Sequence, residues 1–275
     1  MVTTDRCTSG DWVEVERVLL ETVEALDAAA AWLGRIHRII AMVDLGDLRE
    51  GMMPANLPAF LEHVTSMPHV EVAGIGTSLT CYGGVVPTAD NLGELVALAA
   101  AAEQQLGRKL LVSGGMSSSL DAALAGQLPP AVTNLRIGES ILLGVSTVTR
   151  EPILGLHTDC MKLHVPVIES LRKPSMPHGV IAQDAFGATP GFEDRGERHR
   201  AICAIGRQDV VPDGLRPMDP RIEVLGASSD HLLLDVEDLP TPPAIGDSIA
   251  FVPDYAATLR LFTSPYVVKE YVSVP

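Results

Sequence analysis

Residues 110–144 constrain the fold more than any other part of the chain, because an apolar segment, a glycine and serine loop, a helix, a second apolar segment and a second glycine loop follow one another there. Residues 110–112 are typical of a strand that is buried on both faces. The loop SGGMSSS (113–119) brings hydroxyls and N–H groups to a helix start, where phosphate is favoured. The sequence therefore predicts a phosphate site there, with a plain turn and N-cap as the alternative.

The residues before 110 repeat the same alternation. Residues 36–43 and 70–75 are predicted strands, residues 12–33, 56–66 and 90–106 are predicted helices, and residues 134–137 supply a fourth predicted strand. A polar loop follows each predicted strand. Alternating strands and helices predict a parallel sheet of four strands, with ligand chemistry at the carboxyl ends of the strands.

The pattern of apolar and turn residues changes after residue 144. Short apolar runs separated by Pro, Gly and Asp occupy residues 166–171, 201–205, 222–225, 231–236, 248–251 and 266–272. Short strands with turn signals at this spacing predict an antiparallel, barrel-like β-domain. We therefore expect two domains, an α/β domain over residues 1–150 and a β-domain over residues 151–275.

Composition narrows the possible partners and the compartment. The net charge of −15 argues against nucleic acid, because phosphate backbones need clustered Lys and Arg. No apolar run has the length of a membrane helix and the first residues do not resemble a signal peptide, so we expect a cytoplasmic protein that does not bind membranes. The scattered cysteines favour reduced thiols over disulfides or zinc. His157, His164 and His178 lack metal-site spacing, so no metal is expected.

From about residue 36 onward the sequence resembles the alanine and ornithine racemase family, the fold-type III pyridoxal phosphate (PLP) enzymes, and most closely its ornithine racemase branch. The resemblance lies in MVDLGDLREG (42–51), GIGTSLTCYGG (74–84), SGGMSSSL (113–120), NLRIGESILLG (134–144), QDAFG (183–187), AIGRQDV (204–210), LGASSDHLLLDV (225–236) and DYAATL (254–259). It implies an α/β barrel with PLP at its mouth, then a β-domain. It also implies small amino-acid substrates and head-to-tail homodimers with shared active sites.

The resemblance also implies roles for individual residues. The cofactor-binding set would be Thr77, Ser117, Ser118, Arg136, Gly138, Glu139, Ser140 and Tyr255. The catalytic set would be Arg49, Arg136, Asp230 and His231. Arg136 would face the pyridine nitrogen of PLP. Because an arginine does not give that nitrogen a proton, the ring is a weaker electron sink, which suits simple racemisation.

Three features of the sequence depart from the family pattern. Met116 stands where this branch is expected to have Asn, and Arg207 stands where alanine racemases carry a catalytic tyrosine. Family members also bind PLP as a Schiff base to a lysine on the first barrel strand, and nothing before residue 36 resembles that strand. The chain has only Lys109, Lys162, Lys173 and Lys269. The expected fold is therefore a partial barrel, resembling the second half of an alanine-racemase-type barrel and followed by the β-domain.

Three hypotheses follow from this pattern. The chain is a PLP-dependent amino-acid racemase, truncated and inactive alone; or it is a non-catalytic PLP-binding or scaffold homologue; or it is one subunit of a split racemase whose partner supplies the missing barrel half. The substrate is left open. A diamino acid such as ornithine or lysine would suit the acidic residues Asp47, Glu50 and Asp230, and alanine is the alternative.

Overall fold

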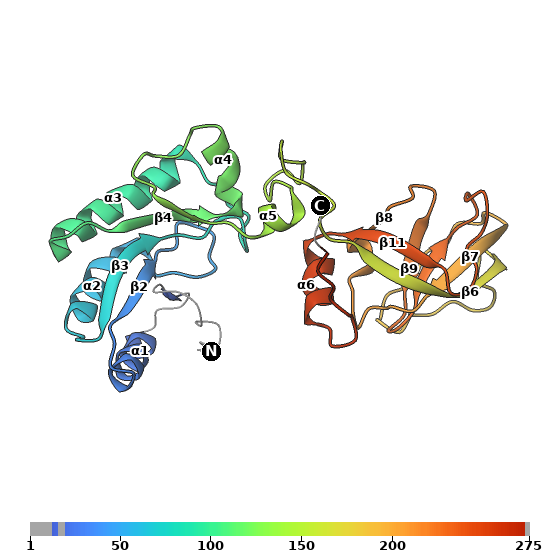
Figure 1. Ribbon diagram of the computed structural model, residues 1–275, viewed down its shortest axis with the longest axis horizontal. Helices are drawn as coiled ribbons and strands as arrows, with labels where there is room; N and C mark the ends of the chain where they lie inside the picture. The colour runs from blue at the N-terminus through green and yellow to red at the C-terminus, as the bar shows by residue number, and fades with distance from the viewer. Residues whose placement is uncertain (1–12, 16–19, 273–275) are drawn as a thin grey trace. The chain divides into compact units, whose positions relative to one another are not determined.

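The first compact unit of the protein is built on a parallel sheet. The structure, a computed structural model, describes residues 13–15 and 20–272 and divides the chain into two units, Met1–Leu156 and His157–Pro275. The strands of the first unit are β1 (Val13–Val15), β2 (His37–Met42), β3 (Val70–Gly76), β4 (Leu111–Met116) and β5 (Asn134–Arg136). They pair in sequence order and all in parallel, as Figure 1 shows, which is the winding of a barrel segment.

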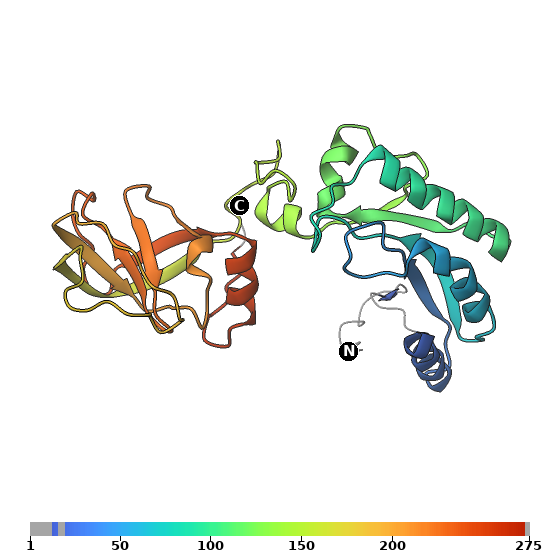
Figure 2. The same cartoon turned by 180° about the vertical axis from the view of Figure 1, so that it is seen from behind.

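Three helices cover one face of this sheet. They are α1 (Leu20–Trp32), α2 (Leu57–Thr65) and α3 (Ala89–Leu106), seen from behind in Figure 2. Ile39 and Ala41, which alternate along β2, pack with Phe60 of α2 and Leu95 of α3 in one core. The other elements of this unit are short: η2 (Pro54–Asn56), η3 (Ser117–Ser119), α4 (Leu120–Leu124) and α5 (Glu139–Leu143).

The opposite face of the sheet is buried as well. Ile40 and Met42 point away from the helices and are buried. A Cβ on Gly76 would come within 3.0 Å of both the Ile40 and the Met42 side chains, so a glycine is needed for the close approach of β3. Burial on both faces explains why β2 reads as a continuous apolar run.

Two sequence predictions for this unit were wrong. The helix expected over residues 12–33 is a strand, β1, followed after an interval by α1; Trp12 and residues 16–19 lie outside the described residues. The sheet consequently has five strands where four were expected. Val13 and Val15 flank Glu14 in a segment that pairs with Ile39–Ala41 of β2. This non-local pairing overrides the helical spacing of nearby apolar residues.

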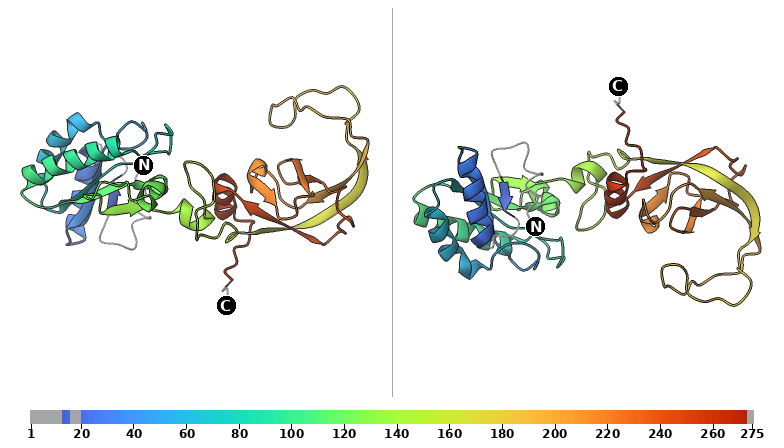
Figure 3. Two further views of the ribbon diagram at one scale, coloured as in Figure 1. Left: turned by 90° about the horizontal axis from the view of Figure 1, so that it is seen from above. Right: turned by 90° about the horizontal axis from the view of Figure 1, so that it is seen from below.

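The second unit is an antiparallel sheet of six strands, β6 (Leu163–Pro174), β7 (Glu197–Cys203), β8 (Leu215–Pro217), β9 (Glu223–Ala227), β10 (Leu232–Asp235) and β11 (Ser248–Pro253). The order is β8-β11-β6-β7-β10-β9, and the edge strands β8 and β9 contact each other, so the sheet nearly closes. The turn η4 (Pro212–Gly214) precedes β8, and the helix α6 (Tyr255–Thr263) follows β11. In Figure 3 the segment between β6 and β7 extends away from this sheet.

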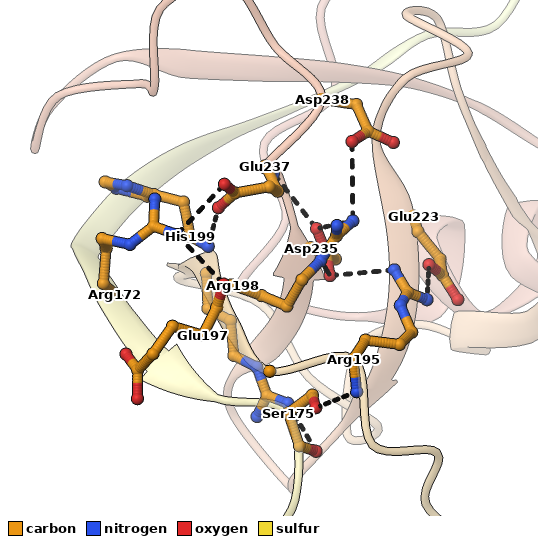
Figure 4. Close-up of polar contacts among 12 residues, drawn as sticks. Arg172, Ser175, Arg195, Glu197, Arg198, His199, Glu223, Asp235, Glu237 and Asp238 are labelled. Carbon is orange, nitrogen blue, oxygen red and sulfur yellow. Dashed lines mark hydrogen bonds and ion pairs between the residues drawn. The ribbon is translucent and has the colours of Figure 1, made fainter.

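A buried carboxylate, Asp235, organises one end of this sheet (Figure 4). It accepts hydrogen bonds from Arg198 Nε at 2.8 Å and from Arg195 Nη2 at 3.1 Å. Burial raises the pKa of the Asp235 carboxyl, but the Arg198 guanidinium and the Glu237 N–H more than offset this, so the pKa lies below its ordinary value. The charges of the cluster are thus paired with one another, which indicates a structural role.

The antiparallel β-domain that the sequence predicts is confirmed, with three differences. Residues 266–272 form no strand, and Tyr266, Val268 and Tyr271 are exposed, while Val267 packs against the core of this unit. Strand β8 and helix α6 were not predicted. Helix α6 starts where Asp254 accepts a hydrogen bond from the Ala257 N–H at 2.8 Å. In the part of the chain that the structure describes, no helix is long and apolar enough to cross a membrane.

Candidate active site

Polar loops follow four neighbouring parallel strands at the carboxyl edge of the first sheet, as the sequence predicts. They comprise residues 44–51 after β2, 77–85 after β3, 113–119 at the end of β4, and 136–140 at the end of β5. Side-chain hydrogen bonds cross between these loops, so they form one connected surface. We call it the carboxyl-edge site.

The loop after β2 is closed on itself. The Asp44 carboxylate accepts hydrogen bonds from the N–H groups of Gly46 at 2.8 Å and Leu48 at 3.2 Å. The two ends of the loop meet where the Met52 carbonyl accepts a hydrogen bond from the Asp44 N–H at 2.9 Å. Gly51 has a φ of 118°, and a Cβ there would lie 2.6 Å from the Asp44 nitrogen. Only glycine therefore fits at this return.

The buried side chain of Asp47 ties this loop to the next one. Its carboxylate accepts the N–H groups of Tyr82 at 2.8 Å, Cys81 at 3.1 Å and Val85 at 3.2 Å. Burial raises the pKa of the Asp47 carboxyl, but these backbone donors outweigh burial and leave the pKa below its ordinary value. Both carboxylate oxygens of Asp47 are occupied by backbone groups, so Asp47 orders the loop and offers little to a substrate.

Arg49 and Glu50 form an ion pair on the same loop. Arg49 Nη1 lies 2.9 Å from Glu50 Oε1, and 37% of the Arg49 side chain is exposed, compared with 5% for Glu50. The second oxygen, Glu50 Oε2, is buried and accepts no hydrogen bond from the described residues. This loop therefore presents a guanidinium at the surface with a buried carboxylate beneath it.

Arg136 lies across the ends of three strands. Its Nη1 donates to Ser113 Oγ at 2.5 Å, and its Nη2 donates to the Thr77 carbonyl and to Ser78 Oγ, both at 2.9 Å. The Ser113 hydroxyl donates onward to Asn134 Oδ1 at 2.6 Å. The guanidinium is thus fixed by groups on β4 and on the loop after β3. The Thr77 hydroxyl is buried beside it without a hydrogen-bond partner among the described residues.

The three serines of η3 have different roles. Ser117 Oγ accepts the N–H groups of Gly138 at 3.1 Å and Ser140 at 3.3 Å, which leaves its own hydrogen to donate. The hydrogen of Ser118 is donated to the Leu79 carbonyl at 2.9 Å, and that of Ser119 to the Gly114 carbonyl at 2.7 Å. Ser118 therefore links η3 to the loop after β3, Ser119 links it to β4, and Ser117 joins it to the loop after β5.

The structure places most of the predicted cofactor residues together at this edge. Thr77, Ser117, Ser118, Arg136, Gly138, Glu139 and Ser140 all belong to it. The Ser140 hydroxyl is buried and has no partner among the described residues, and the Glu139 carboxylate pairs with Arg150. Helices α4 and α5 have only five residues each, so this edge offers a ligand individual hydroxyl and N–H donors more than a helix dipole.

The other predicted site residues belong to the second unit. Asp230 and His231 form the turn between β9 and β10, with His231 Nδ1 3.4 Å from Asp230 Oδ1. A hydrogen bond from the Ser229 hydroxyl lowers the pKa of the Asp230 carboxyl. Tyr255 is the first residue of α6 and is exposed. The roles of these three residues stay predictions.

Sequence reasoning did not anticipate a contact between Phe186 and Arg207. The Arg207 guanidinium carbon lies 4.7 Å from the centre of the Phe186 ring, and Arg207 Nε donates to the Ala227 carbonyl at 3.0 Å. The Arg207 N–H donates to the Ser228 carbonyl at 2.9 Å, beside Asp230. The arginine that stands at position 207 in place of tyrosine thus makes a cation–π contact with Phe186, which belongs to the long segment between β6 and β7.

The first unit contains one lysine, and it does not lie at the carboxyl edge of the parallel sheet. Lys109 precedes β4 at the opposite edge, is 92% exposed and pairs with Glu103 at 2.7 Å. Lys162, Lys173 and Lys269 belong to the second unit and contact Asp159, Glu169 and the Ser264 carbonyl. Within residues 13–15 and 20–272, no group of three or more His, Cys, Asp or Glu side chains is arranged to hold a metal ion.

Several known proteins are similar to this chain in sequence, in fold or in both. A model of the alanine racemase N-terminal domain matches residues 18–145. An ornithine racemase from Acetoanaerobium sticklandii is 46% identical over 253 residues, covering 91% of this chain and 72% of that protein. A lysine racemase from Thermotoga maritima is 38% identical over 252 residues, covering 91% and 70%. The crystal structure of a Bartonella henselae alanine racemase with covalently bound pyridoxal phosphate superimposes with a TM-score of 0.55 at 18% identity, covering 88% of this chain and 65% of that one.

The fold and the carboxyl-edge site define a protein of the α/β-barrel and β-domain type. The chain belongs to the alanine and ornithine racemase family of fold-type III PLP-dependent isomerases, in its ornithine racemase branch. The family resemblance deduced from the eight motifs is therefore confirmed.

The residues at the carboxyl edge fit the phosphate and the ring of PLP. Two buried hydroxyls, of Thr77 and Ser140, lack partners among the described residues, and Ser117 keeps a hydrogen to donate. Buried polar groups without partners are costly, and an anionic ligand with several oxygens would satisfy them. Arg136 adds a positively charged group at the same edge. Lys109, the lysine of this unit, lies at the opposite edge and does not fit a Schiff base here.

Proposed function

We propose that this protein is a PLP-dependent amino-acid racemase that holds its cofactor in the carboxyl-edge site. The observation that carries the proposal is the convergence of Ser117, Arg136 and the buried hydroxyl of Thr77 on one edge of a parallel sheet. The relatives at 46% and 38% identity, an ornithine and a lysine racemase, support it. In this proposal residues 1–150 form the PLP-binding half and residues 151–275 form the β-domain.

Each site residue then has a binding or positioning role. Ser117 and Ser140 donate to the phosphate, with the backbone near Gly138 and Glu139 shaping its cradle. Ser118 holds that cradle against the loop after β3 through Leu79. Arg136 faces the ring nitrogen and Thr77 lies beside the ring. Tyr255 donates to the phosphate from the β-domain, and Arg49 lines the mouth.

Bound PLP makes the α-proton of an amino acid acidic, and racemisation then requires removal of that proton on one face and its return on the other. Arg136 offers the ring N–H donors and no carboxylate that would favour a protonated nitrogen. It therefore holds the ring without supplying a proton to the nitrogen. In this proposal, Asp230 and His231 of a second copy of the chain contact the substrate in a homodimer.

The substrate that we propose is a diamino acid of the ornithine or lysine type, because the two relatives act on these amino acids according to their names. We also propose a cytoplasmic location. The described cysteines, Cys81, Cys160 and Cys203, are free thiols, which suits a reducing compartment.

Chiral chromatography tests the proposal. The purified chain is incubated with PLP and either L-ornithine, L-lysine or L-alanine, and we expect the D-enantiomer of ornithine or lysine to accumulate. Borohydride reduction followed by mass spectrometry then shows whether any of the four lysines carries PLP. No enantiomer exchange together with no lysine adduct would exclude a stand-alone racemase.

The position of the lysines favours one second candidate, a homologue that binds PLP without catalysing a reaction. This candidate predicts saturable PLP binding in equilibrium dialysis without a lysine adduct and without racemisation. The same set of measurements therefore separates the two functions.

We expect Ser117→Ala to weaken PLP binding by about 10-fold, because it removes one hydrogen bond to a charged ligand. Equilibrium dialysis of PLP against the chain measures the loss. Ser119→Ala is the matched control, since the Ser119 hydroxyl donates to the Gly114 carbonyl and not to the cradle. Equal losses in both variants would contradict the assignment of Ser117 to the phosphate.

A further inference from the structure

The acidic side chains of the carboxyl-edge site are Asp44, Asp47, Glu50 and Glu139. Asp44 and Asp47 accept hydrogen bonds from backbone N–H groups within the loops, and Glu139 pairs with Arg150. Each of these three carboxylates therefore already has a hydrogen-bond or ion-pair partner within the protein. Glu50 is different, because only Oε1 has a partner, Arg49 Nη1 at 2.9 Å, while Oε2 has none among the described residues.

A buried carboxylate oxygen without a donor is unfavourable, since the charged form has lost its water and gained no hydrogen bond in return. The Glu50 side chain is 5% exposed, so water does not easily supply the missing donor. A cationic N–H group that reaches Oε2 would satisfy it and would complete the neutralisation that Arg49 begins.

Two exposed groups neighbour the buried Glu50 carboxylate. The Arg49 side chain is 37% exposed, and the neighbouring Cys81 is exposed as well. Burial raises the pKa of the Cys81 thiol, while the charge of Arg49 lowers it and the charge of Glu50 raises it, so both charges are felt at Cys81.

We propose that Glu50 determines substrate specificity by accepting the distal ammonium group of a diamino acid through Oε2. The proposal rests on the proposed function, whose substrate class it explains. An ammonium group has three donors and no acceptor, so it suits a carboxylate oxygen that has no other donor. A neutral side chain of the same length leaves that oxygen unsatisfied and binds more weakly.

Equilibrium dialysis of ornithine and norvaline provides the test, because norvaline is ornithine without the distal amino group. The chain is first saturated with pyridoxine 5′-phosphate, which fills the phosphate site and lacks the aldehyde that would react with amino acids. We expect the wild-type chain to prefer ornithine by about 10- to 100-fold, the range for a charged hydrogen bond in a sheltered site. Glu50→Gln should reduce the preference to about 2-fold or less while leaving norvaline binding unchanged.

Glu62→Gln, on the exposed surface of α2, makes the same change of charge and should keep the full preference. Glu50→Asp, which moves the charge without removing it, should give an intermediate preference. Equal binding of ornithine and norvaline by the wild-type chain overturns the proposal whether or not the variants fold. A preference that survives in Glu50→Gln overturns it too.

The failures of the two proposals have different signatures. If wild-type protein racemises ornithine but Glu50→Gln keeps the binding preference, the racemase function stands and Glu50 is not the specificity residue. If no amino acid is racemised but the preference disappears in Glu50→Gln, Glu50 still recognises the diamino acid and the racemase proposal fails.

Discussion

Asp235→Ala is expected to destabilise the β-domain by about 3–5 kcal/mol, the usual cost of removing one partner from a buried ion pair. The substitution leaves the side chains of Arg195 and Arg198 without the carboxylate that both contact (Figure 4). Hydrogen exchange measured by mass spectrometry resolves the effect. Peptides from β6, β7 and β10 should lose protection, while peptides from β2 and β3 keep it.

Asp219→Ala is the matched control for this effect. Asp219 also pairs with an arginine, Arg221, at 2.7 Å, and hydrogen bonds from Arg221 lower the pKa of the Asp219 carboxyl to about 2. This pair lies at the surface, where ion pairs contribute little to stability. If Asp219→Ala removed as much protection as Asp235→Ala, burial would not be the reason for the loss.

Asp47→Ala is expected to cost about 2–4 kcal/mol, because three backbone N–H groups lose their acceptor at a buried position. The loop of residues 77–85 should become disordered before the rest of the first unit. Urea unfolding followed by far-ultraviolet circular dichroism measures the cost, since α1, α2 and α3 supply most of the helix. Hydrogen exchange of the Tyr82 and Val85 amides measures the local loss.

The contribution of Asp47 should depend on pH. Its pKa in the folded protein lies below the ordinary value of 3.8, so its stabilisation is fully present above pH 3.8 and is lost as the pH falls through the folded value. The difference in unfolding free energy between wild type and Asp47→Asn should therefore shrink in acid below pH 3.8. A difference that does not change with pH would show that the charge of Asp47 is unimportant.

Asp90→Asn serves as the control for Asp47, because Asp90 is an exposed acid in the first turn of α3. It should leave the exchange of the Tyr82 and Val85 amides unchanged. Similar loss of protection in Asp90→Asn would point to a general effect of net charge.

Much of the carboxyl-edge site was predictable because it depends on local patterns. The loops SGGMSSS and NLRIGES follow apolar segments, and the carboxyl ends of parallel strands share one edge, so Ser117 and Arg136 had to lie near each other. The different roles of neighbouring serines were not predictable. Whether Ser117 or Ser118 keeps a hydrogen to donate depends on which carbonyl lies within reach, and Leu79 comes from a distant segment.

Strand β1 shows the same limit in the fold. Val13 and Val15 lie in a region with helical spacing, and they form a strand because the edge of β2 is available for pairing. Conversely, residues 266–272 have the composition of a strand and form none, although Val267 packs against the core of the second unit.

The sequence by itself determined the alternation of helices and strands from residue 36 to residue 144, the change to short strands after it, and the family to which the chain belongs, because apolar periodicity and turn residues act over a few positions. Only the tertiary structure decided how each polar side chain is used. Asp47 is occupied by backbone N–H groups and Glu50 keeps an oxygen without a donor, although both are acids on one loop. That difference arises because hydrogen-bond satisfaction depends on groups that meet in space from separate parts of the chain.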